Sequence, residues 1–198
     1  MKYNKWPIAA WLLAILCVPS WGWTQRLTPE QYQKLKTDIT ITNQAEFATD
    51  VANSDFQKLA DAYNLVLSPP YWTWKSSLAA RVIYEDTSAD GTTWDWATHM
   101  AQTVAERGAW DTMFFSPPIN PSLPQVRAAF TKIYSGNTAQ QNAQKAHLLA
   151  ISRRPARRVE MVLRVITLGD GTTANPATMG YEGLISPNDI YITLTQTP

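Results

Sequence analysis

The chain has 198 residues, of which 45% are hydrophobic and 17% are charged, and its formal net charge is +1. This composition excludes a disordered or fibrous chain and is typical of a globular protein. The one cysteine, Cys17, excludes a disulfide framework and a thiolate zinc site, and His99 and His147 lie in different segments. We therefore expect neither a metal centre nor a cofactor.

Residues 1–25 have the layout of a secretory signal peptide. Two lysines precede an apolar run from Trp6 to Val18, and Ser20 and Gly22 place small residues before a cleavage point. An apolar run of about 13 residues is too short to span a bilayer comfortably, so we expect no stable membrane anchor. Export would place the mature protein in the periplasm or outside the cell. Two alternatives stay open: the segment is retained as an interfacial or buried helix, or the true start codon lies downstream of it.

Residues 26–198 are predicted to form a single, mainly α domain of several helices. Thr28-Pro29-Glu30-Gln31 is a capping box with proline at the first helical position, and Ser68-Pro69-Pro70 is one of the proline-rich stops between helices. In chain order, the predicted helices cover about residues 28–39, 45–65 with a break at 53–54, 78–84, 94–114, 122–135, 139–152 and a short stretch near 159–163.

The strongest helical pattern runs from about Trp94 to Phe114. Apolar residues recur there three or four positions apart, apart from one step across Arg107 and Gly108. The residues of this pattern are Trp96, Met100, Val104, Trp110, Met113 and Phe114. We expect this segment to be the central core helix.

The hydrophobic period changes near the C-terminus. Residues 165–168 are predicted as a strand and 177–184 as a returning strand, which gives a small C-terminal β-hairpin at about 164–184. Ser186-Pro187-Asn188-Asp189 favours the start of a short helix, although residues 190–194 have the β-branched content of a strand.

Charge is unevenly distributed along the chain. Residues 30–111 carry a net charge of −6, whereas residues 112–169 carry +7. The middle of the positive block holds four arginines within six positions, namely Arg153, Arg154, Arg157 and Arg158. Arginine suits bidentate pairing with carboxylates or phosphates, so these four residues are candidates for partner binding.

Three interpretations of the arginine cluster remain open. The arginines can pair with acidic residues of the same chain as ordinary surface ion pairs. They can face a neighbouring copy, since complementary patches on one molecule permit contacts that close into a ring. They can also bind nucleic acid through its backbone, although the nearly neutral chain as a whole does not favour nucleic acid as the main partner.

Tyr71, Trp72 and Trp74 could form a platform on which a saccharide stacks, because aromatic side chains offer contact area at low entropic cost. In an extended segment the two tryptophans would point the same way. The alternative is that these residues belong to the core and lid of a tryptophan-rich domain.

The sequence contains no coherent catalytic set. Glu85 and Asp86, or Glu106 and Asp111, could serve as acid and base, but nothing near them supplies a nucleophile, an oxyanion hole or a metal. His99 and His147 are interpreted as structural, hydrogen-bonded histidines. We therefore expect a protein without enzymatic activity.

From Leu27 to about Asp189 the chain resembles a family of small uncharacterised proteins of tailed bacteriophages and prophages. The stretches that carry the resemblance are Leu27-Thr28-Pro29-Glu30-Gln31, Ser68-Pro69-Pro70, Trp72-Thr73-Trp74-Lys75, Glu106-Arg107-Gly108-Ala109-Trp110, Asn120-Pro121-Ser122-Leu123-Pro124-Gln125-Val126-Arg127-Ala128, Ala146-His147-Leu148-Leu149-Ala150-Ile151-Ser152, Arg154-Pro155-Ala156 and Ala174-Asn175-Pro176-Ala177-Thr178-Met179-Gly180-Tyr181-Glu182-Gly183.

This resemblance implies a phage origin and a structural place in the virion, in the neck or tail region. Genes of the family tend to lie among genes for virion parts, and the family offers no catalytic motif to carry over. Its members typically begin near the Leu27 position, so the leader is a departure that weakens the export interpretation and strengthens that of an upstream mis-start.

The sequence thus predicts a non-enzymatic virion or assembly protein, assembled in the host cytoplasm, whose partners are other virion proteins or copies of itself. The alternative is an exported binding module that uses Tyr71, Trp72 and Trp74 on a saccharide or a cell-envelope ligand.

Overall fold

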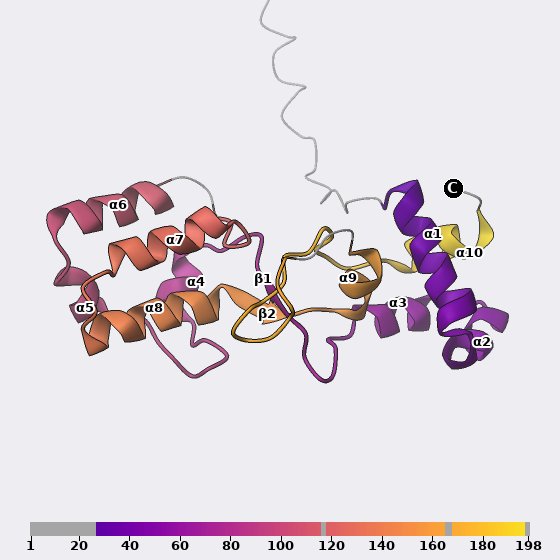
Figure 1. Ribbon diagram of the computed structural model, residues 1–198. Helices are drawn as coiled ribbons and strands as arrows, with labels where there is room; N and C mark the ends of the chain where they lie inside the picture. The colour runs from indigo at the N-terminus through magenta and orange to yellow at the C-terminus, as the bar shows by residue number, and fades with distance from the viewer. Residues whose placement is uncertain (1–26, 116–117, 165–167, 197–198) are drawn as a thin grey trace, which may run out of the picture.

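The computed structural model describes residues 27–115, 118–164 and 168–196. They form a mainly helical chain with one small two-stranded antiparallel sheet, which confirms the predicted fold class (Figure 1). In chain order the elements are α1 (Pro29–Thr37), the π-helical turn η2 (Asp38–Thr42), α2 (Gln44–Ala52), α3 (Phe56–Asn64), β1 (Trp72–Trp74), α4 (Ala80–Glu85), α5 (Trp96–Met100), α6 (Val104–Phe114), α7 (Pro124–Ile133), α8 (Ala139–Ile151), β2 (Arg153–Pro155), α9 (Arg158–Leu163) and α10 (Pro187–Thr195). No helix in these ranges is long and apolar enough to cross a membrane.

The helices gather in two groups on either side of the sheet (Figure 1). The terminal lobe contains α1, η2, α2, α3, α9 and α10, and the middle lobe contains α4 to α8. Each lobe has its own cluster of buried hydrophobic side chains. Strands β1 and β2 lie between the lobes, so the sheet connects the two hydrophobic cores.

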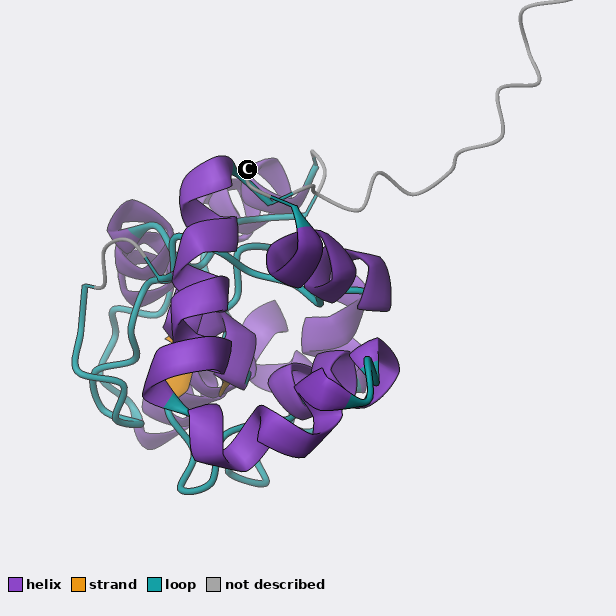
Figure 2. Cartoon of the chain, turned by 90° about the vertical axis from the view of Figure 1, so that its right-hand side faces the viewer, coloured by secondary structure: helices purple, strands orange, loops and turns teal. Residues whose placement is uncertain are grey.

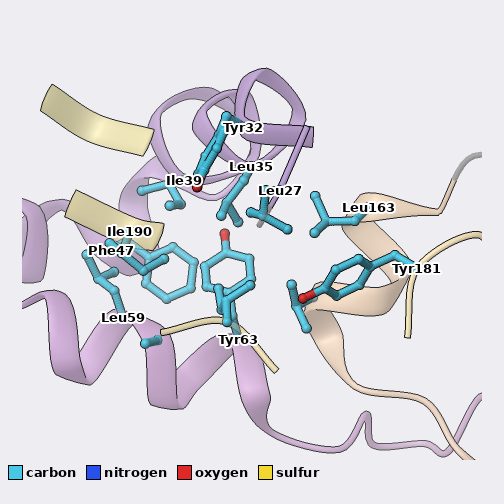
Figure 3. Close-up of a cluster of buried hydrophobic side chains, with 13 residues drawn as sticks. Leu27, Tyr32, Leu35, Ile39, Phe47, Leu59, Tyr63, Leu163, Tyr181 and Ile190 are labelled. Carbon is cyan, nitrogen blue, oxygen red and sulfur yellow. The ribbon is translucent and has the colours of Figure 1, made fainter. Parts of the chain in front are cut away.

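The terminal lobe brings the two ends of the described chain together. Figure 3 shows its core, where side chains from α1, α3, α9 and α10 converge around Tyr63. The Tyr63 hydroxyl donates to Asp38 Oδ2 at 2.6 Å, and the Tyr32 hydroxyl donates to Asp189 Oδ1 at 3.1 Å. In Figure 2, which looks at this end of the molecule, helices cover the front and the strands lie behind them. Polar bonds at the edge of an apolar core thus fix η2 against α3 and α1 against α10.

The middle lobe is built around aromatic side chains. Trp110 is 1% exposed, and its indole Nε1 donates to the Tyr84 hydroxyl at 2.9 Å. The ring of Trp94 lies 4.9 Å from that of Trp110, within the range in which aromatic pairs attract. His99 is buried beside them, with its Nδ1 2.9 Å from the Tyr134 hydroxyl. The lobe is therefore held by a packed aromatic cluster with internal hydrogen bonds.

The sheet does not lie where the sequence predicted a hairpin. Trp72 pairs with Pro155, and Trp74 pairs with Arg153, so the strands are 79 residues apart in the chain at their closest facing positions. Residues 177–184, predicted as a returning strand, are loop with a single bridge from Ala177 to Thr73. Residues 165–167 of the other predicted strand lie outside the described residues. Strands that pair over such a distance in the chain are not joined by a local turn, so the sequence contains no turn motif from which this sheet could have been predicted.

The predicted central helix from Trp94 to Phe114 is wrong, because two helices, α5 and α6, occupy this segment. The helical pattern is interrupted at Thr103. Its hydroxyl accepts a hydrogen bond from the Glu106 backbone N–H at 3.2 Å, and Glu106 Oε2 accepts one from the Thr103 backbone N–H at 2.9 Å. This reciprocal capping box starts a new helix at Val104. The break rotates part of the apolar pattern away from the core.

Other helix boundaries follow the sequence closely. The capping box at Thr28 opens α1, and the predicted break at residues 53–54 separates α2 from α3. Ser186 accepts from the Asp189 backbone and opens α10, which resolves the ambiguity at the C-terminus in favour of a helix. Local capping chemistry, where it is present, therefore predicted the elements well.

Candidate interaction surface

Arg153 connects the sheet to two loops. Its guanidinium pairs with Asp90, and its Nη1 donates to the Thr173 carbonyl oxygen at 2.5 Å. The same guanidinium lies over the Trp72 ring, 5.4 Å from the ring centroid. Because its side chain is only 11% exposed, Arg153 is committed to contacts within its own chain.

Arg154 is held by two carboxylates. Its Nη1 and Nη2 donate to Glu160 at 2.8 and 2.7 Å, and its Nε donates to Glu182 Oε1 at 3.0 Å. Burial lowers the pKa of Arg154, but the hydrogen bonds and charges of Glu160 and Glu182 outweigh burial and leave that pKa raised. This arginine is fully engaged between β2, α9 and the loop before α10.

Arg158 and Arg157 are neighbours in the chain, but only the Arg158 side chain forms an ion pair within the described residues. Arg158 makes a bidentate pair with Glu46 at 2.6 and 2.8 Å and lies over the Phe47 ring at 4.7 Å. The hydrogen bond from Arg158 lowers the pKa of Glu46. Arg157 donates its backbone N–H to Glu160, and its side chain forms no ion pair with any residue in the described ranges.

Three of the four candidate arginines are therefore paired with carboxylates of the same chain. Because their guanidinium groups already bind carboxylates inside the molecule, these three arginines offer few free donors to a partner.

The predicted aromatic platform is also occupied. Trp72 and Trp74 alternate with the fully buried Thr73 on β1 and so share one side of the strand. Arg153 lies over Trp72, and Arg127 lies over Trp74 at 4.4 Å. These cation–π contacts cover one face of each indole ring. They favour a structural role for the two tryptophans over an open site on which a saccharide could stack.

Tyr71, the third member of the platform, packs against the loop that follows α9. A side chain added at Gly171 would meet the Tyr71 ring at 2.1 Å, so the two residues are in close contact. The platform residues are therefore split between two different environments.

The carboxylates considered as acid and base do not converge on a common cavity. Glu85 pairs with Arg81 at 2.7 Å, and Glu106 caps α6. Hydrogen bonds from the backbone and hydroxyl of Thr103 lower the pKa of Glu106, which fits a capping carboxylate. Asp111 lies on the exposed side of α6, away from Glu106. Within the described ranges, no three metal-ligating side chains lie close enough to hold a metal ion.

Both histidines take part in buried hydrogen bonds of the middle lobe. His147 has its Nε2 3.0 Å from the Ile83 carbonyl oxygen and its Nδ1 3.1 Å from the Thr92 hydroxyl. Burial lowers the pKa of His99. These geometries agree with the structural interpretation of both residues.

Among the described residues, four exposed large apolar side chains lie on or next to α5 and α6, and three of them belong to the apolar pattern from which a core helix was predicted. Trp96 is 52% exposed, Met100 59%, Val104 78% and Phe115, which directly follows α6, 94%. Scattered exposed apolar residues are ordinary, but several large ones on two consecutive helices make this part of the surface a candidate interaction site. We define the α6 face by four residues that recur at helical spacing on one side of the helix: Val104, Gly108, Asp111 and Phe115.

The α6 face has a hollow at one end and an uncrowded glycine in its middle. A hollow of about 240 Å³ opens beside Phe115 and is lined by that residue together with Asp111 and Thr112. At Gly108, no atom of the described residues outside the adjoining backbone of the helix lies within 4 Å of the place where a side chain would begin. Asp111 forms no ion pair with any residue that the structure describes.

The α6 face was not predicted, because residues 94–114 have the apolar spacing of one continuous helix in the sequence. The α6 face could have been predicted from the capping box Thr103-Val104-Ala105-Glu106, because this motif indicates that a new helix starts within the apolar pattern. A helix beginning at residue 104 and burying Trp110 leaves Val104 and Phe115 on the opposite side.

No protein-family model, no curated protein and no solved structure matches this chain.

Proposed function

We propose that the protein is a non-enzymatic structural or assembly component of a tailed-bacteriophage particle, located in the neck or tail. It acts through protein–protein contacts with other virion proteins or with copies of itself. The resemblance of residues 27–189 to phage proteins supports the class. The proposal does not require the arginine cluster, whose side chains are mainly engaged within the chain.

The observation that carries the proposal is the exposed apolar surface of α5 and α6. Large side chains such as Val104 and Phe115, at 78% and 94% exposure, gain free energy when a partner covers them. The interior of the lobe is well packed around Trp110, so these side chains are not left over from a poorly formed core. A surface of this kind suits a subunit that is completed by its neighbours.

The test is incorporation into particles. The gene is deleted from the phage or prophage that encodes it, and wild-type protein, a Val104→Asp/Phe115→Asp variant or an Ile41→Asp control is supplied in the host. Ile41 is a matched control because it is 72% exposed but lies on η2, in the other lobe. Particles are purified by density gradient, and the protein is measured in them by mass spectrometry.

We expect wild-type protein and the Ile41 variant to co-purify with particles, deletion to lower the yield of infectious particles, and the α6 variant to be lost from them. Protein that is absent from particles and starts near Trp23 in the periplasm would contradict the proposal and favour an exported binding module.

A further inference from the structure

The α6 face can be complementary to itself. Val104 and Phe115 stand near opposite ends of the helix, 11 residues or about three turns apart, and share one side. Gly108 lies between them with open space above it. If a second α6 lies antiparallel across this face, residues equally distant from the crossing point face each other. Val104 of one copy then meets the hollow beside Phe115 of the other.

The charged side chains of α6 are also arranged so that two antiparallel copies would place opposite charges together. Arg107 and Asp111 lie on the same flank of the α6 face, and neither forms an ion pair with a residue in the described ranges. The Arg107 guanidinium donates a hydrogen bond of 3.2 Å from its Nη1 to the Met100 carbonyl oxygen. In an antiparallel two-fold pair a flank faces the same flank of the partner helix. Arg107 of each copy then lies opposite Asp111 of the other.

We propose that α6 is the self-association surface of this protein and that two copies pack their α6 helices antiparallel about a two-fold axis. The inference rests on the proposed assembly function and names the partner at the α6 face as a second copy of the chain. An apolar contact between Val104 and Phe115 and an ion pair between Arg107 and Asp111 each occur twice. Such an isologous contact is the commonest form of protein dimer.

The contact is a small one. A single pair of helices covers less than the roughly 800 Å² per partner of a standard interface, so a weak dimer is expected. Figure 1 shows α6 at the edge of the middle lobe, away from the terminal lobe, so each copy keeps the rest of its surface for other partners. A weak dimer of this kind assembles fully only at the high local concentration of a particle.

Orientation is tested by disulfide trapping of the full chain in a Cys17→Ser background. Val104→Cys and Phe115→Cys proteins are oxidised separately and as a mixture. The antiparallel arrangement predicts a covalent dimer in the mixture and little in either protein alone, because identical positions would lie about 16 Å apart along the helix. Dimers in the separate proteins, and none specific to the mixture, would overturn the proposal.

Energetics are tested by sedimentation velocity of the full chain over a wide concentration range. Wild-type protein should shift towards twice the monomer mass. Arg107→Glu and Asp111→Arg should each weaken dimerisation at least about fivefold, because the two-fold axis repeats each repulsion. The double variant Arg107→Glu/Asp111→Arg restores the pairing and should return to within about twofold of wild type.

Ile41→Glu is the control and should leave association unchanged, since Ile41 lies in the terminal lobe. Circular dichroism of every variant establishes that the monomer is folded. A wild-type protein that stays monomeric throughout, or single charge variants that behave like Ile41→Glu, would overturn the inference. Neither result touches the proposed function, which fails only if the protein is absent from particles.

Discussion

Arg154 and Glu160 form a bidentate ion pair in which the Glu160 side chain is completely buried and the Arg154 side chain is 18% exposed. Glu160 also accepts the backbone N–H of Arg157 at 2.8 Å and that of Gly183 at 3.1 Å. One carboxylate thus joins β2, the start of α9 and the loop that leads to α10. A buried charge with this many partners is costly to change, because Arg154 loses its buried counter-charge and two backbone N–H groups lose their carboxylate acceptor.

Glu160→Gln should therefore destabilise the protein by about 3 kcal/mol. The amide keeps the size of the side chain but leaves the Arg154 charge facing Glu182 alone, which lies at the more exposed side of the pair. Urea unfolding followed by circular dichroism measures the loss. Glu30→Gln, which breaks the exposed Glu30–Lys34 pair, is the control and should cause no measurable change. Equal stability of the two variants would show that the buried pair is not required.

Gly171 provides a second test of how the segment after α9 is fixed. Gly171 and Gly91 both have positive φ, +79° and +76°, but only Gly171 is crowded, by Tyr71. Gly91→Ala should cost about 1 kcal/mol from backbone strain, whereas Gly171→Ala should cost at least about 2 kcal/mol more because the new side chain strikes the ring.

A double-mutant cycle separates strain from the clash. In a Tyr71→Ala background, Gly171→Ala should cost only what Gly91→Ala costs, since the ring is gone. Chemical denaturation of the four proteins gives the coupling. An unchanged penalty in the Tyr71→Ala background would mean that the ring does not restrict Gly171.

Where the sequence predicted the fold correctly, it did so through local chemistry. The Thr28 box, the break after α2 and the Ser186 start of α10 each depend on hydrogen bonds between residues a few positions apart. The pairing of Trp72 with Pro155 depends on residues far apart in the chain. Period-2 patterns identify strand-like segments but not their partners, so the sheet was predicted in the wrong place.

The contacts of the candidate site residues could not be predicted either, because they also depend on residues far apart in the chain. The arginine cluster was visible in the sequence, but its partners Glu46, Asp90 and Glu182 come from three other segments that only the fold brings close. Conversely, Val104 has the spacing of a core residue in the sequence but is exposed in the fold, because helical spacing alone does not say which side of a helix faces inward.

His99 should make stability depend on pH. Burial lowers the pKa of His99 in the folded protein below the ordinary value of about 6.5, so the unfolded chain binds its proton more readily. Stability is therefore complete above about pH 6.5 and is lost as the pH falls from there towards the folded pKa. The slope contributed by this one proton is at most about 1.4 kcal/mol per pH unit.

The contribution of His99 is isolated with His99→Asn, which can keep a hydrogen bond to Tyr134 but does not titrate. Unfolding free energies measured between pH 8 and pH 5 should fall more steeply for wild type than for the variant. All other titrating groups are shared by the two proteins, so parallel curves would refute the assignment to His99.

Thr103 should be essential for the helix start that exposes the α6 face. Thr103→Ala removes the hydroxyl that accepts from the Glu106 backbone, and loss of a threonine cap costs about 1 kcal/mol. Thr112→Ala is the matched control, because Thr112 lies within the same helix, is exposed and donates only to the Gly108 carbonyl one turn earlier. Thermal unfolding should show a lower Tm for Thr103→Ala and an equal or higher Tm for Thr112→Ala, since alanine favours helix interiors. If the two variants melt alike, the capping box does not determine where α6 begins, and the separation of α5 from α6 has another cause.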